Sequence, residues 1–192
     1  MADKKRRALA KERRARDRAR AKRRRVWLLA AAGAVALAAV ATIPVLIRAR
    51  PGRSVESQGR AHIPVGTSGA VVYNTDPPTS GPHYDPSAAP GIYDAPIPDG
   101  YLIHSLEHGY VILSHSLESL PDDEAERTLA ELIRIAEEET LWKLIVIPRP
   151  GMEHRFALTA WQRIDTFDEL DERRIRRFIS AWRDRGPEHT AN

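Results

Sequence analysis

An uncharged apolar segment at residues 26–47 constrains the fold more than any other feature of the sequence. It contains 22 residues, mostly Ala, Val, Leu and Ile. About 20 helical residues cross the roughly 30 Å hydrocarbon core of a bilayer, so the segment is long enough to span it. Trp27 stands near its beginning, where interfacial aromatic residues are common. The sequence therefore predicts one N-terminal transmembrane helix at residues 26–47.

The charges that flank this segment predict its orientation. Residues 1–25 contain 14 Lys and Arg against three acidic residues, whereas only Arg48, Arg50 and Arg53 closely follow the segment. By the positive-inside rule, residues 1–25 form a basic cytoplasmic arm and the rest of the chain is extracytoplasmic. The alternative is a secretory signal peptide cleaved near residues 39–41. An uncleaved anchor is favoured, because apolar residues continue beyond that point.

Charge is distributed very unevenly, and this limits the partners. The net charge of the whole chain is +4, but residues 51–192 hold 14 basic and 23 acidic residues. We expect residues 4–25 to bind anionic lipid headgroups, and we expect no nucleic-acid partner, since no aromatic side chains are interleaved with the basic ones. The sequence has no Cys, which excludes disulfides, thiolate metal sites and cysteine nucleophiles.

The remaining residues divide into a linker at 48–62 and an extracytoplasmic α+β domain at 63–188. Short runs rich in residues that favour strands predict strands at 110–114, 141–147 and 156–164. Two amphipathic helices are predicted, one at 119–138 with a Ser119–Asp122 cap and one that begins at Thr166 and ends before Gly186. We expect a small, mainly antiparallel sheet with two packed helices.

Residues 77–98 contain seven of the 14 prolines, which excludes regular structure there. A loop of this length within a compact domain is usually functional or disordered. Three apolar side chains can anchor it, namely Tyr84, Ile92 and Tyr93, so an ordered loop is expected.

Two short motifs contain the residues that are able to take part in catalysis or metal binding. The first is Pro-Pro-Thr-Ser-Gly-Pro-His at residues 77–83, and the second is His-Ser-Leu-Glu-His-Gly at 104–109. The second matches H-x-x-E-H, a zinc-peptidase motif that requires a long helix. Gly109 ends any helix here and a strand follows, so at most one helical turn is expected at 103–108. A metallopeptidase is therefore disfavoured.

A bend at 104–108 still allows a shared metal site. His83, His104 and His108 are the candidate ligands, with Glu107 as a fourth ligand or as a carboxylate that orients an imidazole. Zinc, copper or nickel suits such a set, and zinc or copper is the candidate cofactor. The alternative is a structural hydrogen-bond network without metal. The other histidines are expected in solvent: His62, His115, His154 and His189.

The two motifs, with Gly91 and Tyr93 between them, resemble a bacterial family known as domain of unknown function 3105. Residues 157–161 and 186–188 are similar to it as well, and the resemblance covers about residues 60–188. It implies one N-terminal membrane helix, hence a bacterial membrane location, and it draws attention to 77–83 and 104–109. One departure is Gln162, where the family often has Gly. The resemblance implies no activity.

Three functions therefore stay open at the level of sequence. The domain binds a transition metal or small ligand through its histidines, or it is a non-enzymatic scaffold for a protein partner that the sequence does not identify. The third is a metal-dependent hydrolase with Glu107 as the general base.

Overall fold

The computed structural model describes residues 20, 23–25, 27–29, 31–34 and 50–188. The chain divides into two units, residues 1–50 and 51–192. In the first unit, residues 27–29 and 31–34 are helical. Within the described ranges, no helix combines the length and the apolar character that crossing a membrane requires. Most of the segment predicted to span the bilayer lies outside the described residues, at 26, 30 and 35–47, as do most of the basic arm and His189.

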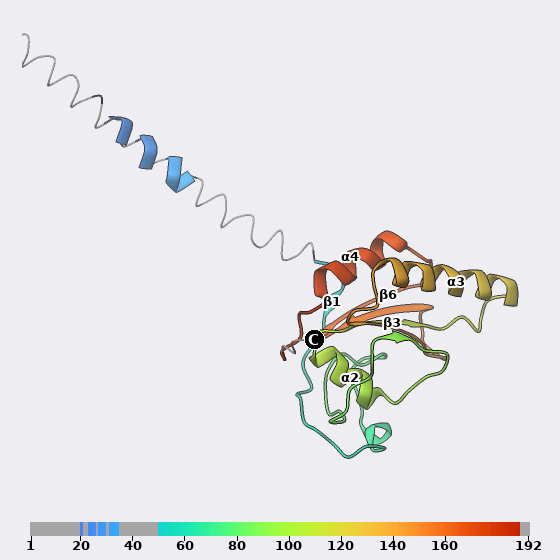
Figure 1. Cartoon of the computed structure of the whole chain (residues 1–192). Helices are drawn as coiled ribbons and strands as arrows, with labels where there is room; N and C mark the ends of the chain where they lie inside the picture. The colour runs from blue at the N-terminus through green and yellow to red at the C-terminus, as the bar shows by residue number, and fades with distance from the viewer. Residues whose placement is uncertain (1–19, 21–22, 26, 30, 35–49, 189–192) are drawn as a thin grey trace, which may run out of the picture. The chain divides into compact units, whose positions relative to one another are not determined.

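The second unit is built on a six-stranded sheet with the order β1-β6-β5-β3-β4-β2 (Figure 1). The strands are β1 Arg53–Ser54, β2 Gly91–Ile92, β3 Val111–His115, β4 Leu144–Pro148, β5 Phe156–Ala160 and β6 Arg163–Phe167. Three pairings are antiparallel, but β4 pairs in parallel with both β3 and β2. The sheet is therefore mixed, with antiparallel pairings in the majority, and the expected α+β class holds.

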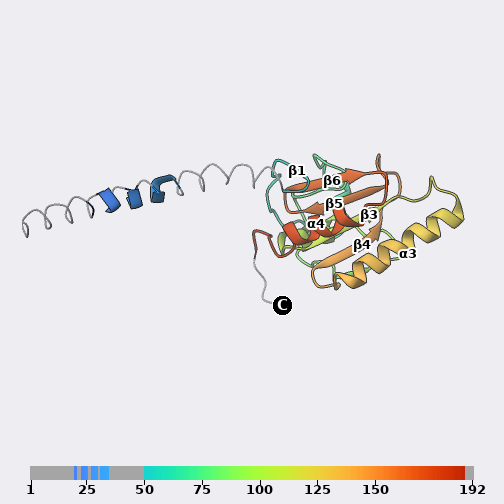
Figure 2. The same cartoon turned by 90° about the horizontal axis from the view of Figure 1, so that it is seen from above.

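Three α-helices pack against this sheet instead of the two expected. They are α2 Asp99–Glu107, α3 Asp122–Glu138 and α4 Glu172–Trp182, with a short 3-10 helix η1 at Ser68–Ala70. Helices α3 and α4 cover one face and α2 lies on the other (Figures 1 and 2). Helix α3 connects β3 to β4, and a crossover of this kind is what makes those two strands parallel.

Alternate residues of the central strands supply two separate cores. On the α3 and α4 face, Val111 and Leu113 pack with Ile135 and Phe178. On the α2 face, Ile112 joins a second cluster that also contains Leu102, Leu106, Ile145 and Ile147. Because β3 and β4 are buried on both faces, they appear in the sequence as continuous apolar runs.

Helix α2 was expected as a single turn at most, and the structure gives it nine residues. Residues 102–107 are all buried, so polar and apolar positions do not alternate with a helical period. The sequence signal for an amphipathic helix depends on one exposed face, which α2 lacks. Gly109, with φ 84°, does end the helix, as the sequence predicted.

Other boundaries also differ from the sequence prediction. Residues 156–164 are not one strand, because a turn at Gln162, with φ 57°, separates β5 from β6. Thr166 therefore lies in β6, and α4 is capped by Asp171, whose side chain accepts a hydrogen bond from the Arg174 backbone N–H. Helix α3 has Pro121 at its N-cap and no side-chain cap, so the predicted Ser119 cap is wrong. The proline-rich loop includes the two-residue strand β2.

Candidate metal site

The end of α2 brings the residues of the second motif together. His104 lies in the last turn, Glu107 is the final helical residue and His108 is the C-cap. Four residues along a helix correspond to a rise of about 6 Å, which places His104 and His108 on one side. Their Nε2 atoms are 2.9 Å apart. The sequence left open whether these two imidazoles meet; in the structure they do, at the end of a regular helix and not through a bend.

The first motif reaches the same place through backbone pairing. The His83 N–H donates to the Ala61 carbonyl at 3.0 Å, and the Ile63 N–H donates to the His83 carbonyl at 2.8 Å. This forms an isolated parallel bridge between His62 and His83. The segment expected as a linker at 48–62 thus supplies both β1 and His62 to the folded unit.

Three imidazoles converge at this point, and we call His62, His83 and His104 the three-His cluster. Their ring centroids lie 4.9 to 5.3 Å apart. One ring nitrogen of each lies within 4.8 Å of the others. Metal–nitrogen bonds of about 2.1 Å in a tetrahedral site separate the nitrogens by about 3.4 Å, so small movements of the rings suffice to close the cluster around an ion.

Backbone carbonyls fix the orientation of two of these rings. The Nδ1 atom of His83 is 2.8 Å from the Gly81 carbonyl oxygen, and that of His104 is 2.6 Å from the Tyr84 carbonyl oxygen. A carbonyl oxygen only accepts hydrogen bonds, so both Nδ1 atoms carry the hydrogen. Each neutral ring then has its lone pair on Nε2, and metal-binding histidines characteristically show this arrangement.

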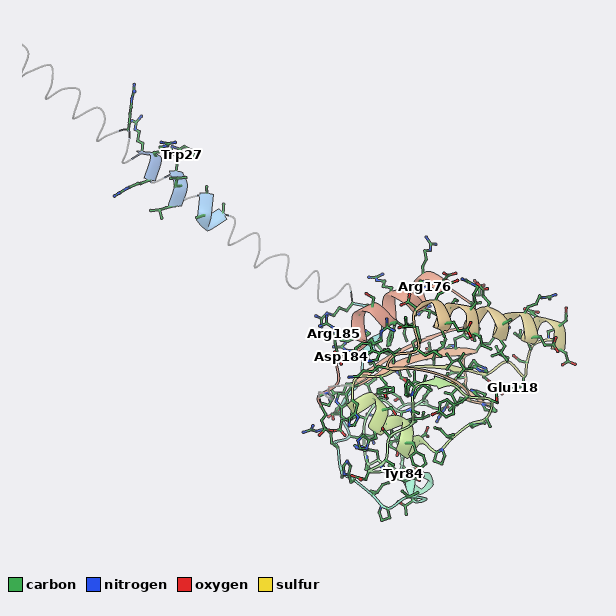
Figure 3. The ribbon with its side chains drawn as sticks, in the orientation of Figure 1. Trp27, Tyr84, Glu118, Arg176, Asp184 and Arg185 are labelled. Carbon is green, nitrogen blue, oxygen red and sulfur yellow. The ribbon has the colours of Figure 1, made fainter. Side chains whose placement is uncertain are left out.

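The side chain of Tyr84 is anchored, and this fixes the Tyr84 carbonyl that lies next to His104 Nδ1. The Tyr84 side chain is almost fully buried, and its hydroxyl oxygen lies 2.7 Å from Ser68 Oγ and accepts from the Ser68 N–H at 3.0 Å. Figure 3 shows Tyr84 on the α2 side of the sheet, opposite the side on which Arg176 of α4 lies. This burial agrees with the prediction that Tyr84 anchors the proline-rich loop.

His83 Nε2 is a buried nitrogen in an unusual environment. It lies 2.9 Å from Glu107 Oε2, and both side chains are almost completely buried. Nε2 has no hydrogen-bond partner among the described residues, and the contact is an ion pair only when the ring is protonated. Burial lowers the pKa of His83, which favours the neutral ring and its lone pair. A lone pair beside a carboxylate is a position that a cation stabilises.

A second group of ligands shares His104, and we call His104, His108 and Glu188 the carboxylate cluster. Their ligand atoms also lie within 4.8 Å of one another. Glu188 Oε2 is 3.2 Å from His108 Nε2. Burial and the neighbouring His104 lower the pKa of His108, whereas Glu188 opposes this shift.

The C-terminal segment at 184–188 places Glu188 by docking against the end of α2. The Glu188 N–H donates to the Glu107 carbonyl at 3.1 Å, and the Asp184 N–H donates to the Gly109 carbonyl at 2.7 Å. Gly186 packs so closely that a Cβ there would overlap the Glu107 carbonyl oxygen and the Gly109 nitrogen. The close approach therefore requires Gly.

The four predicted site residues are thus adjacent, but the two ligand groups differ from the predicted set. His83 and His104 belong to one group, and His104 and His108 to the other, while Glu107 contacts His83 and lies 3.4 Å from Arg60 Nη1. Sequence reasoning missed His62 and Glu188. Only the similarity of residues 186–188 to the family pointed towards Glu188.

Other histidines are less relevant to the site. His115 was expected in solvent, but it is 7% exposed on β3. His154 is half-buried and its Nδ1 lies 3.0 Å from Asp168 Oδ2. His62 is about half exposed, so its solvent contact was correctly expected even though its neighbours were not.

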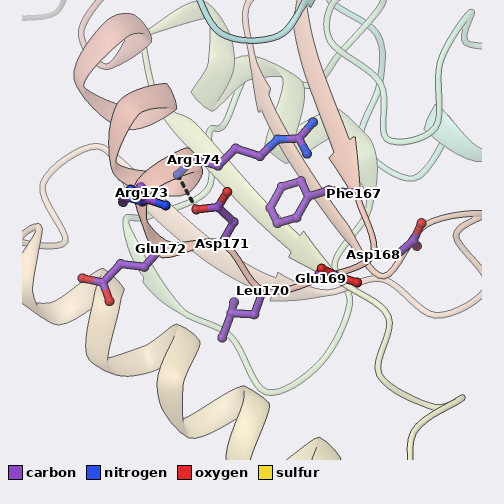
Figure 4. Close-up of a pocket in the computed structure, with 8 residues that line it drawn as sticks. All are labelled: Phe167, Asp168, Glu169, Leu170, Asp171, Glu172, Arg173 and Arg174. Atoms are coloured by element: carbon purple, nitrogen blue, oxygen red, sulfur yellow. Dashed lines mark hydrogen bonds between the residues drawn. The ribbon is translucent and has the colours of Figure 1, made fainter.

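A surface pocket of about 620 Å³ lies elsewhere, where β6 leads into α4 (Figure 4). It is lined by residues 167–174, and its charged groups interact locally. Arg174, for example, donates two hydrogen bonds to Asp165 in addition to the backbone bond to Asp171. This pocket contains no residue of either histidine group.

The comparison with protein families agrees with the resemblance noted in the sequence. Residues 65–192 match the family described as a protein of unknown function, DUF3105. The chain belongs to the DUF3105 family. Among curated proteins and solved structures, none matches this DUF3105 chain significantly. The family description gives no activity, so a function for the DUF3105 domain has to be argued from its site.

Proposed function

We propose that this DUF3105 protein is a single-pass, membrane-anchored domain that binds a transition-metal ion on the extracytoplasmic side through its three-His cluster. The observation that carries the metal proposal is the orientation of His83 and His104. Both rings have Nδ1 committed to a backbone carbonyl, and both are buried. An ion would bind the Nε2 lone pairs of both rings together with the ring of His62, and in doing so would displace the hydrogen bond between His104 Nε2 and His108 Nε2.

The choice of metal follows from the donor atoms. Imidazole nitrogens suit zinc, copper and nickel, and a neighbouring carboxylate such as Glu107 is compatible with zinc. The sequence has no Cys, so no thiolate can be a ligand. We therefore favour zinc or copper as the bound ion, with Glu107 as a fourth ligand or as the anion that balances its charge.

Elemental analysis of the purified full-length chain, produced without a histidine tag, tests this function. We expect about one equivalent of zinc or copper, and a loss of most of it in His104→Ala. A Glu137→Gln variant is a matched control, since Glu137 is exposed on α3 and distant in sequence from the cluster. Absence of metal after incubation with each ion would favour the scaffold role instead.

The membrane part of the proposal rests on the sequence. Residues 26–47 are uncharged and apolar, and the 14 basic residues before them favour a cytoplasmic N-terminus and contact with anionic headgroups in the bacterial membrane. Protease treatment of spheroplasts should degrade residues beyond about 50 and protect an epitope at the N-terminus. Release of the protein into the medium would instead indicate cleavage of a signal peptide.

A further inference from the structure

His104 has only one ring nitrogen that can bind an ion. Its Nδ1 carries the hydrogen that is donated to the Tyr84 carbonyl, at 2.6 Å, so the single lone pair is on Nε2. The three-His cluster and the carboxylate cluster both include His104. Because one lone pair binds one metal ion, the two clusters cannot both use His104 at the same time.

The carboxylate cluster is already close to the geometry of a ligand set. The His104 and His108 Nε2 atoms are 2.9 Å apart, and Glu188 Oε2 is 3.2 Å from His108 Nε2. Both separations are within about 0.5 Å of the 3.4 Å expected around a tetrahedral zinc ion. Since His104 Nε2 is the acceptor, His108 Nε2 supplies the hydrogen between the two rings. An ion at this position would replace that proton.

The two clusters differ in exposure and in donor type. The three-His cluster includes the fully buried His83, next to the buried Glu107. The carboxylate cluster instead has side-chain exposures of 18% for His108 and 55% for Glu188. Its carboxylate is carried by the C-terminal segment, which docks on α2 through backbone bonds. The three-His cluster also reaches solvent through the half-exposed His62, so the difference is that the carboxylate cluster offers solvent an anionic ligand of its own.

We infer that His104, His108 and Glu188 form a second position for the same ion, and that the ion exchanges between the two positions while it stays on His104 Nε2. This rests on the proposed metal-binding function and extends it. One ion is bound per chain, and His104 is the ligand common to both positions. A site of this kind exchanges its ion with solvent or with another carrier more readily than a closed structural zinc site, in which four protein ligands surround the metal.

Titration with Co²⁺, followed by its visible absorption, tests this in the full-length chain in detergent. We expect wild-type protein to bind one Co²⁺. His83→Ala should still bind one, with a shifted spectrum and weaker affinity, because the carboxylate cluster is intact. His62→Ala should also bind one Co²⁺ with a shifted spectrum and weaker affinity. Because His62 is half exposed, this variant replaces His83→Ala if the latter does not fold. Glu188→Gln should keep one Co²⁺ but take it up at least about tenfold more slowly.

The combined variant His83→Ala/Glu188→Gln should lose at least about 100-fold in affinity relative to wild type, with Glu137→Gln as the control. Two Co²⁺ ions per wild-type chain would overturn the inference, since the clusters would then be independent. Loss of all Co²⁺ binding in both His62→Ala and His83→Ala would also overturn the inference. The proposed function would stand, because the ion would then bind at the three-His cluster alone. No Co²⁺ in wild-type protein would overturn the proposed function, and this inference with it.

Discussion

The Nε2 atom of His83 lies 2.9 Å from Oε2 of Glu107, and no hydrogen bond joins them. In the neutral ring that burial favours, the Nδ1 hydrogen of His83 is donated to Gly81, and two buried acceptors then face each other. Buried polar atoms without partners are rare in folded proteins and call for an explanation, such as an ion. This relationship supports the metal-binding role proposed above over the structural network that the sequence left open, and the variants below test which of the two holds.

The first prediction concerns Glu107→Gln. The amide can donate a hydrogen bond to His83 Nε2, so the metal-free variant should be as stable as wild type or more so. It lacks the negative charge that favours a cation, so metal affinity should fall about 10- to 100-fold. Thermal unfolding with chelator and a competition assay for zinc measure the two effects. A variant that is destabilised but binds zinc normally would indicate a structural salt bridge.

The second prediction concerns Gly186→Ala. A Cβ at this position overlaps backbone atoms of Glu107 and Gly109, so the C-terminal segment has to shift away from α2. We expect the free energy of unfolding to fall by about 1–3 kcal/mol, as for other overpacked sites. Urea denaturation measures it. Gly69→Ala is the control, because no atom lies within 4 Å of its Cβ position, and a similar loss there would refute the explanation.

The third prediction concerns the turn between β5 and β6. Gln162 has φ 57°, and its backbone N–H donates to Thr79 while its carbonyl accepts from Val55. Gly keeps both bonds and removes the left-handed strain, so Gln162→Gly should raise the free energy of unfolding by about 0.5–1 kcal/mol. Gln162→Val should lower it, since β-branched residues strongly disfavour positive φ. Equal stabilities of the two variants would contradict this argument.

The fourth prediction concerns pH. His115 is buried on β3, and burial lowers its pKa in the folded state. In the unfolded chain the pKa of a histidine is about 6.5, so the unfolded chain binds the proton more readily than the folded one. Stability is complete above about pH 6.5 and falls as the pH drops below that value.

Urea denaturation of metal-free protein at several pH values tests this dependence. Wild type should lose stability between about pH 7 and pH 5, and His115→Gln should lose less over the same range. The slope should not vanish in the variant, because the pKa values of His83 and His108 are lowered as well. Parallel curves for the two proteins would show that His115 does not contribute.

Local patterns in the sequence predicted the elements with one exposed face or a continuous apolar run. Helices α3 and α4 and strands β3 and β4 are of this kind, although their caps were misplaced where Pro121 and Asp171 replaced the expected residues. Helix α2 was underestimated because it is buried nearly all round. The β5–β6 turn was missed because Gln162 adopts a conformation for which its side chain gives no signal.

Residue patterns along the chain were enough to identify the apolar segment, the two histidine motifs, the end of α2 at Gly109 and the family. Tertiary structure alone decided which groups meet. His62 reaches His83 through a backbone bridge, and Glu188 reaches His108 from about 80 residues away through bonds to α2. Backbone pairing between distant segments depends on the path of the whole chain, not on the side chains that it brings together. Local sequence spacing therefore pointed only to the His104–His108 pair, and not to the groups that join it from distant segments.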